Sequence, residues 1–171
     1  MSELRVRSRW WYWVAAVPLV TAFWAASALW LAVVVAVVPE AGASTTSAVV
    51  SIPAVALGVP ALVVFLAMPL AAHMDGRAVR DAGGELPEVA ATTPQLGTAV
   101  DLVLVAGVYL FFEGSGSVRE PDPLGTLLVA VAVLGGTWLA VRYVRERREV
   151  VAMPSSLREW RAELGESETV R

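Results

Sequence analysis

Asp101, His73 and Asp75 are the residues of this chain whose types and positions could do chemistry. Asp101 is the only acid between Leu96 and Phe112, a run that is otherwise almost wholly apolar. An ionisable side chain in such a run indicates a functional site, because a charge held away from water needs a partner or a water-filled cavity. His73 is the only histidine, and it stands with Asp75 at the end of the preceding apolar run.

We expect these three side chains at a similar depth, on the cytoplasmic side of a membrane. A contact between His73 and Asp101 would orient the imidazole, hold a proton or contribute to an ion site. The alternative interpretation is that both carboxylates reach water at the membrane interface and that His73 stands at the boundary of the apolar run. The sequence leaves both interpretations open.

Composition and motifs exclude several kinds of site. The absence of cysteine rules out disulfides, thiolate metal sites and cysteine nucleophiles, and a single histidine rules out two-histidine zinc sites. The sequence contains no G-x-G-x-x-G, Walker, H-E-x-x-H or G-x-S-x-G pattern. We therefore expect no enzyme, no catalytic residues, no cofactor and no metal site. The formal net charge of −3 argues against binding to nucleic acid.

The elements that must position these residues are predicted to be membrane-spanning helices. Hydrophobic residues make up 57% of the chain and charged residues 17%, which is typical of membrane proteins. Residues 10–38 contain no charge, and as a helix they would be about 43 Å long, more than the roughly 30 Å core of a bilayer. This run is about twice the length of a signal-peptide core, which favours a retained anchor over a cleaved signal.

Three further apolar runs are long enough to cross. The predicted spans are 10–38, 48–72, 96–112 and 123–143, joined by an external link at 39–47, a cytoplasmic link at 73–95 and an external link at 113–122. In 96–112 a central aspartate costs about +2.5 to +3.5 kcal/mol, but the Leu, Val and Phe residues contribute about −3 to −6 kcal/mol. Pro60 predicts a kink near the middle of 48–72, because a proline removes a helical hydrogen bond.

Local signals predict how the helices begin and end. Asp75 is expected to cap a short helix that the glycines at Gly83 and Gly84 end. Asp122 followed by Pro123 predicts the start of the last span. The aromatic residues at 10–13 are expected at a lipid interface.

The arginines predict the orientation. Residues 1–9, 73–95 and 142–171 hold twelve of the thirteen arginines, and only Arg119 falls in an external link. The positive-inside rule therefore places both termini in the cytoplasm. Within the tail, a short amphipathic helix is predicted at 156–164, lying on the membrane surface or against the bundle. The predicted fold is all-α: a polytopic four-helix transmembrane bundle in the plasma membrane.

Two kinds of surface could bind partners. Small residues at helical spacing permit close helix packing; they are Ala22 and Ala26, then Ala28, Ala32 and Ala36, and in the last span Ala132, Gly136 and Ala140. An arginine patch could bind anionic lipid head groups, although setting orientation explains it equally well. The patch comprises Arg142, Arg145, Arg147 and Arg148.

Two motifs carry a resemblance to a known group of proteins. They are residues 75–80, Asp-Gly-Arg-Ala-Val-Arg, and Pro-Asp-Pro at 121–123 before a span that ends in Arg-Tyr-Val-Arg-Glu-Arg-Arg at 142–148. Together they resemble small haloarchaeal membrane proteins of unknown function, although here a whole extra span separates the two motifs. The resemblance implies a halophilic archaeal plasma membrane and no particular activity.

The sequence favours a non-enzymatic accessory or scaffold protein, which would pack with itself or with a membrane-protein partner in the lipid bilayer. The alternative function is a small oligomeric transporter or channel that uses the Pro60 kink and Asp101.

Overall fold

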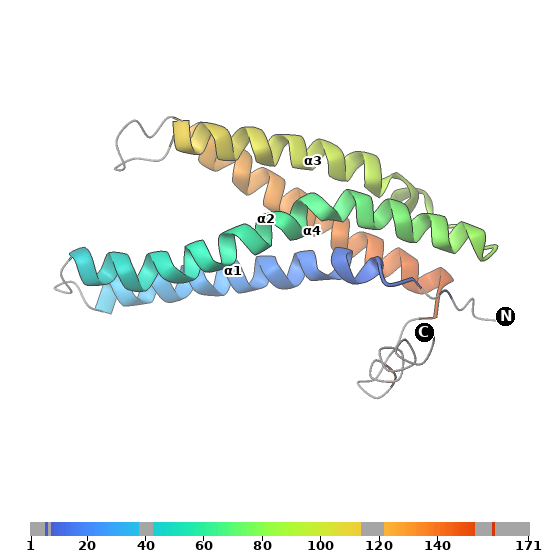
Figure 1. The fold of residues 1–171 in the computed structure, drawn as a ribbon, viewed down its shortest axis with the longest axis horizontal. Coiled ribbons are helices and arrows are strands. Elements are labelled where there is room, and N and C mark those ends of the chain that lie inside the picture. Colours follow the sequence, from blue (N-terminus) through green and yellow to red (C-terminus); the bar gives the residue numbers. More distant parts are fainter. Residues whose placement is uncertain (1–5, 7, 38–42, 114–121, 153–158, 160–171) are drawn as a thin grey trace, which may run out of the picture.

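The computed structural model describes residues 6, 8–37, 43–113, 122–152 and 159. These residues contain four α-helices and no strand: α1 (Trp11–Val37), α2 (Ala43–Asp81), α3 (Glu88–Glu113) and α4 (Pro123–Val150). Consecutive helices run antiparallel (Figure 1). The expected terminus 1–9 and the link at 113–122 fall largely outside the described residues, as does the amphipathic helix at 156–164 except for Glu159. Of the expected link at 39–47, residues 39–42 lie outside the described residues and 43–47 are helical, because α2 begins at Ala43.

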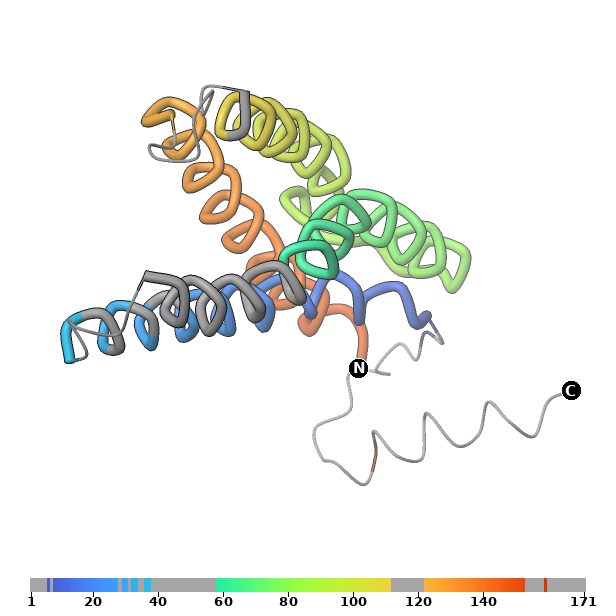
Figure 2. Tube along the Cα trace, turned by 60° about the vertical axis from the view of Figure 1, so that its left-hand side comes forward, coloured from blue at the N-terminus to red at the C-terminus, as the bar shows by residue number. Residues whose placement is uncertain are grey.

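The helices pack in a ring rather than around a common axis. Among the described residues α1 contacts α2 and α4, α3 contacts the same two helices, and α1 and α3 do not meet. The most extensive contact joins α3 to α4, whereas α2 and α4 barely touch across the ring. All four helices lie together at one end, and the α1–α2 and α3–α4 pairs diverge toward the other (Figure 1). Figure 2 shows the same separation between the end of α1 and the start of α4.

The core lies at the end where the helices converge. Its side chains come from every helix: Val14 and Val17 of α1, Phe65, Met68, Ala71 and Ala72 of α2, Ala90 and Leu104 of α3, and Ala132, Ala140 and Tyr143 of α4. After Val17, none of the α1 side chains that the structure describes is buried. A hydrogen bond of 2.8 Å between the hydroxyls of Thr21 and Thr137 joins α1 to α4 just beyond this core.

Three helical stretches are long and apolar enough to cross a membrane: Gly58–Asp81, Glu88–Phe111 and Pro123–Val150. The described apolar stretch of α1, Trp11–Ser27, is shorter. Large apolar side chains are exposed along all of these segments, among them Leu19, Leu70, Leu102 and Leu134.

The helix bounds agree with the predicted run at α1 and with the predicted start of α4, which continues past the predicted end at 143 to Val150. They differ at α2 and α3. The region 73–95, predicted as a link, is mostly helical, because α2 continues to Asp81 and α3 begins at Glu88. Asp75 is therefore inside α2 and does not cap a helix. Pro94 lies inside α3 without ending it.

Two of the predicted helix boundaries are confirmed. Gly83 has a φ of +83°, and the amide of Gly84 donates to the carbonyl of Val79 at 2.9 Å, which closes the C-terminus of α2. At the start of α4, the Asp122 carboxylate accepts a hydrogen bond of 3.2 Å from the amide of Leu124.

Glycines allow α3 and α4 to approach closely. A Cβ atom added at Gly125 would lie 2.5 Å from the backbone nitrogen of Phe111, and one added at Gly107 would lie 2.8 Å from the nitrogen of Val129. The backbones of the two helices are therefore in direct contact at this point, and neither position has room for a side chain.

We predict opposite effects for alanine at two glycines of α4. Gly125→Ala should lower the free energy of unfolding by about 1–3 kcal/mol, because its Cβ would meet the α3 backbone. Gly135→Ala should be neutral or stabilising by up to about 1 kcal/mol, since alanine favours helix and its Cβ would lie 3.8 Å from Val100. Unfolding followed by circular dichroism measures both changes, and equal losses in the two variants would contradict the close approach.

Candidate functional site

A buried ion pair lies at the end where the four helices converge. Arg147 of α4 donates from Nε to Oδ2 of Asp75 at 2.7 Å and from Nη2 to Oδ1 at 3.2 Å. Both side chains are almost completely buried, with 1% and 0% of their surface exposed. This two-bonded geometry matches the planar guanidinium to the carboxylate, so both charges are compensated within the protein.

Two aromatic residues complete this cluster. The hydroxyl of Tyr143 donates to Asp75 Oδ2 at 2.7 Å. The guanidinium carbon of Arg147 lies 5.3 Å from the centre of the Trp11 ring, within the range of a cation–π interaction. The buried polar cluster thus comprises Trp11 of α1, Asp75 of α2, and Tyr143 and Arg147 of α4.

Glu146 brings α3 into the same region. Its Oε2 accepts a hydrogen bond of 2.9 Å from the backbone amide of Ala90, in the first turn of α3. Amides of a first turn have no partner within their own helix, so Glu146 serves as a cap supplied by α4. Its other oxygen, Oε1, accepts from Nε of Arg142 at 2.8 Å.

The cluster is suited to holding helices together rather than to reacting. Each oxygen of Asp75 already accepts a hydrogen bond, and the Tyr143 proton is donated to that carboxylate. The groups are shielded from water, and Asp75 lines neither of the two cavities described below. We therefore assign the cluster a structural role.

We predict that Arg147→Met will lower the free energy of unfolding by about 3–5 kcal/mol, because it leaves the Asp75 charge buried without its partner. The exposed neighbour on the same helix, Arg148→Met, is the matched control and should change stability by no more than about 0.5 kcal/mol. Titration with sodium dodecyl sulfate in mixed micelles measures both variants.

The double variant Asp75→Asn/Arg147→Met provides a second readout. It should lose less stability than the sum of the two single variants, because the buried charge is removed together with its partner. A strictly additive loss would show that the ion pair does not couple α2 to α4.

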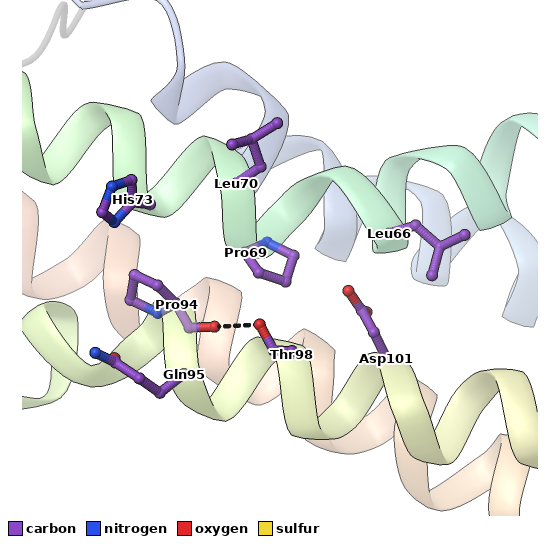
Figure 3. Close-up of a pocket in the computed structure, with 8 residues that line it drawn as sticks. All are labelled: Leu66, Pro69, Leu70, His73, Pro94, Gln95, Thr98 and Asp101. Atoms are coloured by element: carbon purple, nitrogen blue, oxygen red, sulfur yellow. Dashed lines mark hydrogen bonds between the residues drawn. The ribbon is translucent and has the colours of Figure 1, made fainter.

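His73 and Asp101 lie in a different place, a groove between α2 and α3. This groove has a volume of about 540 Å³ and is lined by Leu66, Pro69, Leu70, His73, Pro94, Gln95, Thr98 and Asp101. His73 and Asp101 stand at opposite ends of it (Figure 3). Within the described part of the chain they form no hydrogen bond with each other.

Asp75 does not share the groove with them. It is two residues from His73 on α2, and residues at that spacing point to different sides of a helix. Asp75 therefore faces the core and α4, whereas His73 is exposed in the groove. The predicted grouping of three residues is thus divided between a buried cluster and an open groove.

A second cavity continues the groove toward the α2–α3 connection. Its volume is about 310 Å³. It shares His73, Pro94 and Gln95 with the α2–α3 groove, and Arg80 and Glu85 line its other end. The two cavities together follow the α2–α3 interface from a charged end to Asp101.

Asp101 has an unusual environment within the groove. Its Oδ1 is buried and has no hydrogen-bond partner in the described structure. Its side chain points across the groove toward α2, near Leu66 and Pro69 (Figure 3). Thr98, one turn away, donates its hydroxyl proton to the carbonyl of Pro94 at 2.9 Å.

The other predicted site residues are placed as follows. Pro60 is exposed on the uninterrupted helix α2 and does not line the groove. In the arginine patch, Arg147 is buried against Asp75 and is not available to lipid head groups.

The other arginines of the patch lie at the surface. Arg142 pairs with Glu146, and its guanidinium carbon lies 5.6 Å from the centre of the Trp138 ring. Arg145 and Arg148 are exposed.

The buried contacts of Tyr143, Glu146 and Arg147 were not predicted from the sequence. A signal for two of them was present, because the predicted stripe of Ala132, Gly136 and Ala140 continues at helical spacing to Tyr143 and Arg147. All five residues are buried on one face of α4. No comparable signal predicted the burial of Trp11, which was expected at a lipid interface and is buried.

Groups of three or more His, Cys, Asp or Glu residues that could hold a metal ion do not occur among the described residues. Comparison of the chain with protein-family models, with curated proteins and with solved structures gives no match.

Proposed function

We propose that the chain is an integral protein of the plasma membrane, with its helices crossing as a four-helix bundle and both termini in the cytoplasm. Three stretches of sufficient length and apolarity support crossing. The exposed leucine, valine and aromatic side chains along the helices suit contact with lipid. The arginine distribution supports the orientation, and the two sequence motifs support a halophilic archaeal membrane.

We predict a specific labelling pattern for this topology, using the absence of native cysteine. Ser115→Cys should react with a membrane-impermeant maleimide in intact cells. Ala82→Cys, in the α2–α3 connection, should react only after lysis. Labelling of both variants, or of Ala82→Cys alone, in intact cells would contradict the proposed orientation.

Within that membrane, we propose a non-enzymatic accessory or scaffold role, in which the chain packs with itself or with a membrane partner. The observation that carries this proposal is the difference in exposure between the predicted small-residue stripes of α4 and those of α1. Ala132, Gly136 and Ala140 of α4 are buried within the chain. The α1 stripes are not used in this way: Ala22, Ala26, Ala32 and Ala36 are exposed, and the side chain of Ala28 lies outside the described residues.

The exposed stripe lies on the half of α1 that extends beyond the core. Small residues at this spacing let a second helix approach closely, so that backbone and side-chain contacts accumulate. The divergence of the helix pairs leaves this half of α1 away from α3 and α4 (Figure 2). A helix from a second copy or from another protein would therefore meet it without disturbing the core.

We predict that a photoreactive maleimide on Ala26→Cys or Ala32→Cys will capture a neighbouring protein in native membranes. The matched controls are Ala99→Cys and Ala106→Cys, which are exposed on α3 and should give no product. A product of about twice the chain mass of 18.2 kDa identifies a second copy, and another mass identifies a different partner. Equal yields on α1 and α3, or no product from α1, would contradict the scaffold role.

A second candidate function is a small oligomeric carrier or channel, and the observation that favours it is the unpartnered carboxylate oxygen of Asp101. Such a path would pass between α2 and α3 beside Pro69 and Pro94 rather than at Pro60. A carrier must first bind its solute, so this function depends on ligand binding in the groove.

A further inference from the structure

The α2–α3 groove, defined by its eight lining residues, has the size and the mixed chemistry of a small-molecule site. Its volume of about 540 Å³ falls within the roughly 300–1,000 Å³ of typical ligand pockets. Leu66, Pro69 and Leu70 give one wall that is apolar. The other wall, from α3, carries the polar groups of Gln95, Thr98 and Asp101 (Figure 3).

The decisive atom is Oδ1 of Asp101, a buried acceptor without a donor. Buried polar atoms are nearly always paired, because an unmade hydrogen bond leaves the cost of desolvation uncompensated. The lining residues do not supply the donor. The Thr98 proton is already given to the Pro94 carbonyl, and His73 stands at the other end of the groove (Figure 3).

Asp75 has the hydrogen-bond and ion-pair partners that Asp101 lacks among the described residues. That carboxylate is balanced by a guanidinium and a phenol hydroxyl. Asp101 has no ion pair within the described residues, and Arg80, the one guanidinium that lines either cavity, lies in the second cavity only. Among the described residues, Oδ1 of Asp101 therefore has no hydrogen-bond donor, and the carboxylate has no positive partner.

We propose that the α2–α3 groove binds a small lipophilic amine, whose ammonium group donates a hydrogen bond to Oδ1 of Asp101. An ammonium group supplies the donor and the charge together. The apolar body of the ligand covers Leu66 and Leu70, which are exposed along the groove. Any polar group at its other end meets His73 and Gln95. This site is separate from the α1 surface and does not depend on the scaffold role.

The same chemistry has two sources, a free amine in solution or the amino head group of a lipid. Asp101 is thirteen residues from the first residue of α3, which corresponds to about 20 Å along the helix. A lipid amino group would reach Asp101 only by moving below the predicted membrane boundary at residue 96, whereas a free amine enters from either cavity. The test therefore includes lipids with and without an amino group.

The first experiment measures binding of naphthylethylamine by equilibrium dialysis, using the full chain in phosphatidylglycerol nanodiscs and empty nanodiscs as the blank. We expect saturable binding, and at least tenfold weaker binding of the neutral analogue naphthylethanol. Asp101→Asn should weaken amine binding by about tenfold to a hundredfold, the range expected for one charged hydrogen bond. Asp101→Glu, which keeps the charge, should retain part of the affinity.

The matched control is Asp81→Asn, which removes a carboxylate from the exposed end of α2 and should bind the amine as the unsubstituted chain does. Circular dichroism of each variant shows whether its helices are intact. No saturable binding by the unsubstituted chain, equal binding of the amine and the alcohol, or unchanged binding by a folded Asp101→Asn would each overturn the proposal.

The second experiment repeats the measurement in nanodiscs that contain phosphatidylethanolamine. Competition by this lipid, lost in Asp101→Asn, identifies a lipid amino group as a ligand of the site. Unchanged amine affinity identifies a free amine as the ligand. Competition that persists in Asp101→Asn would place the lipid elsewhere and would contradict a shared site.

Discussion

The ion pair between Asp75 and Arg147 is the interaction on which the arrangement of the helices depends. It joins α2 to α4 at a point where both charges are shielded from water, and it places the Trp11 ring of α1 over the guanidinium. One residue earlier on α4, Glu146 caps the first turn of α3. Two neighbouring side chains of α4 thus fix the positions of the other three helices. A buried pair of this kind adds little net stability over apolar packing, but it penalises any arrangement that separates the partners.

The position of this pair explains the asymmetry of the molecule. Near the pair, all four helices contribute to one core, and the Thr21–Thr137 hydrogen bond joins α1 to α4 just beyond it. Farther along, the glycines keep α3 and α4 in close contact, but α1 departs from them (Figure 1). The same packing leaves the groove between α2 and α3, because these helices meet at Gly97 and Pro69 while Leu66 and Leu70 remain uncovered.

The hydrophobic pattern of the sequence predicted the helical class and the existence of four helices, because long apolar runs can be recognised without tertiary information. It did not predict the bounds of α2 and α3, because the polar residues 73–81 and 88–95 are held in helices by tertiary contacts that the sequence does not show.

The ion pair was also not predicted. Asp75 and Arg147 are 72 residues apart, and Arg147 belongs to a cluster of arginines that is typical of an orientation signal. The two motifs that carry the sequence resemblance nevertheless meet at this pair. His73 and Asp101 line the same groove, but the predicted contact between them is absent. Their separation along the groove follows from the register of α2 against α3, which no local pattern specifies.

The length of α2 has a consequence for the bilayer that would surround the proposed bundle. Its 39 residues correspond to about 58 Å of helix, close to twice the hydrocarbon thickness. Because its first and last turns contain polar residues, the extra length can extend into water on either side of the bilayer, and the helix can also tilt or bend. The ion pair joins α2 to α4 near the end of α2 at Asp81, so the end that begins at Ala43 has more freedom to tilt or bend.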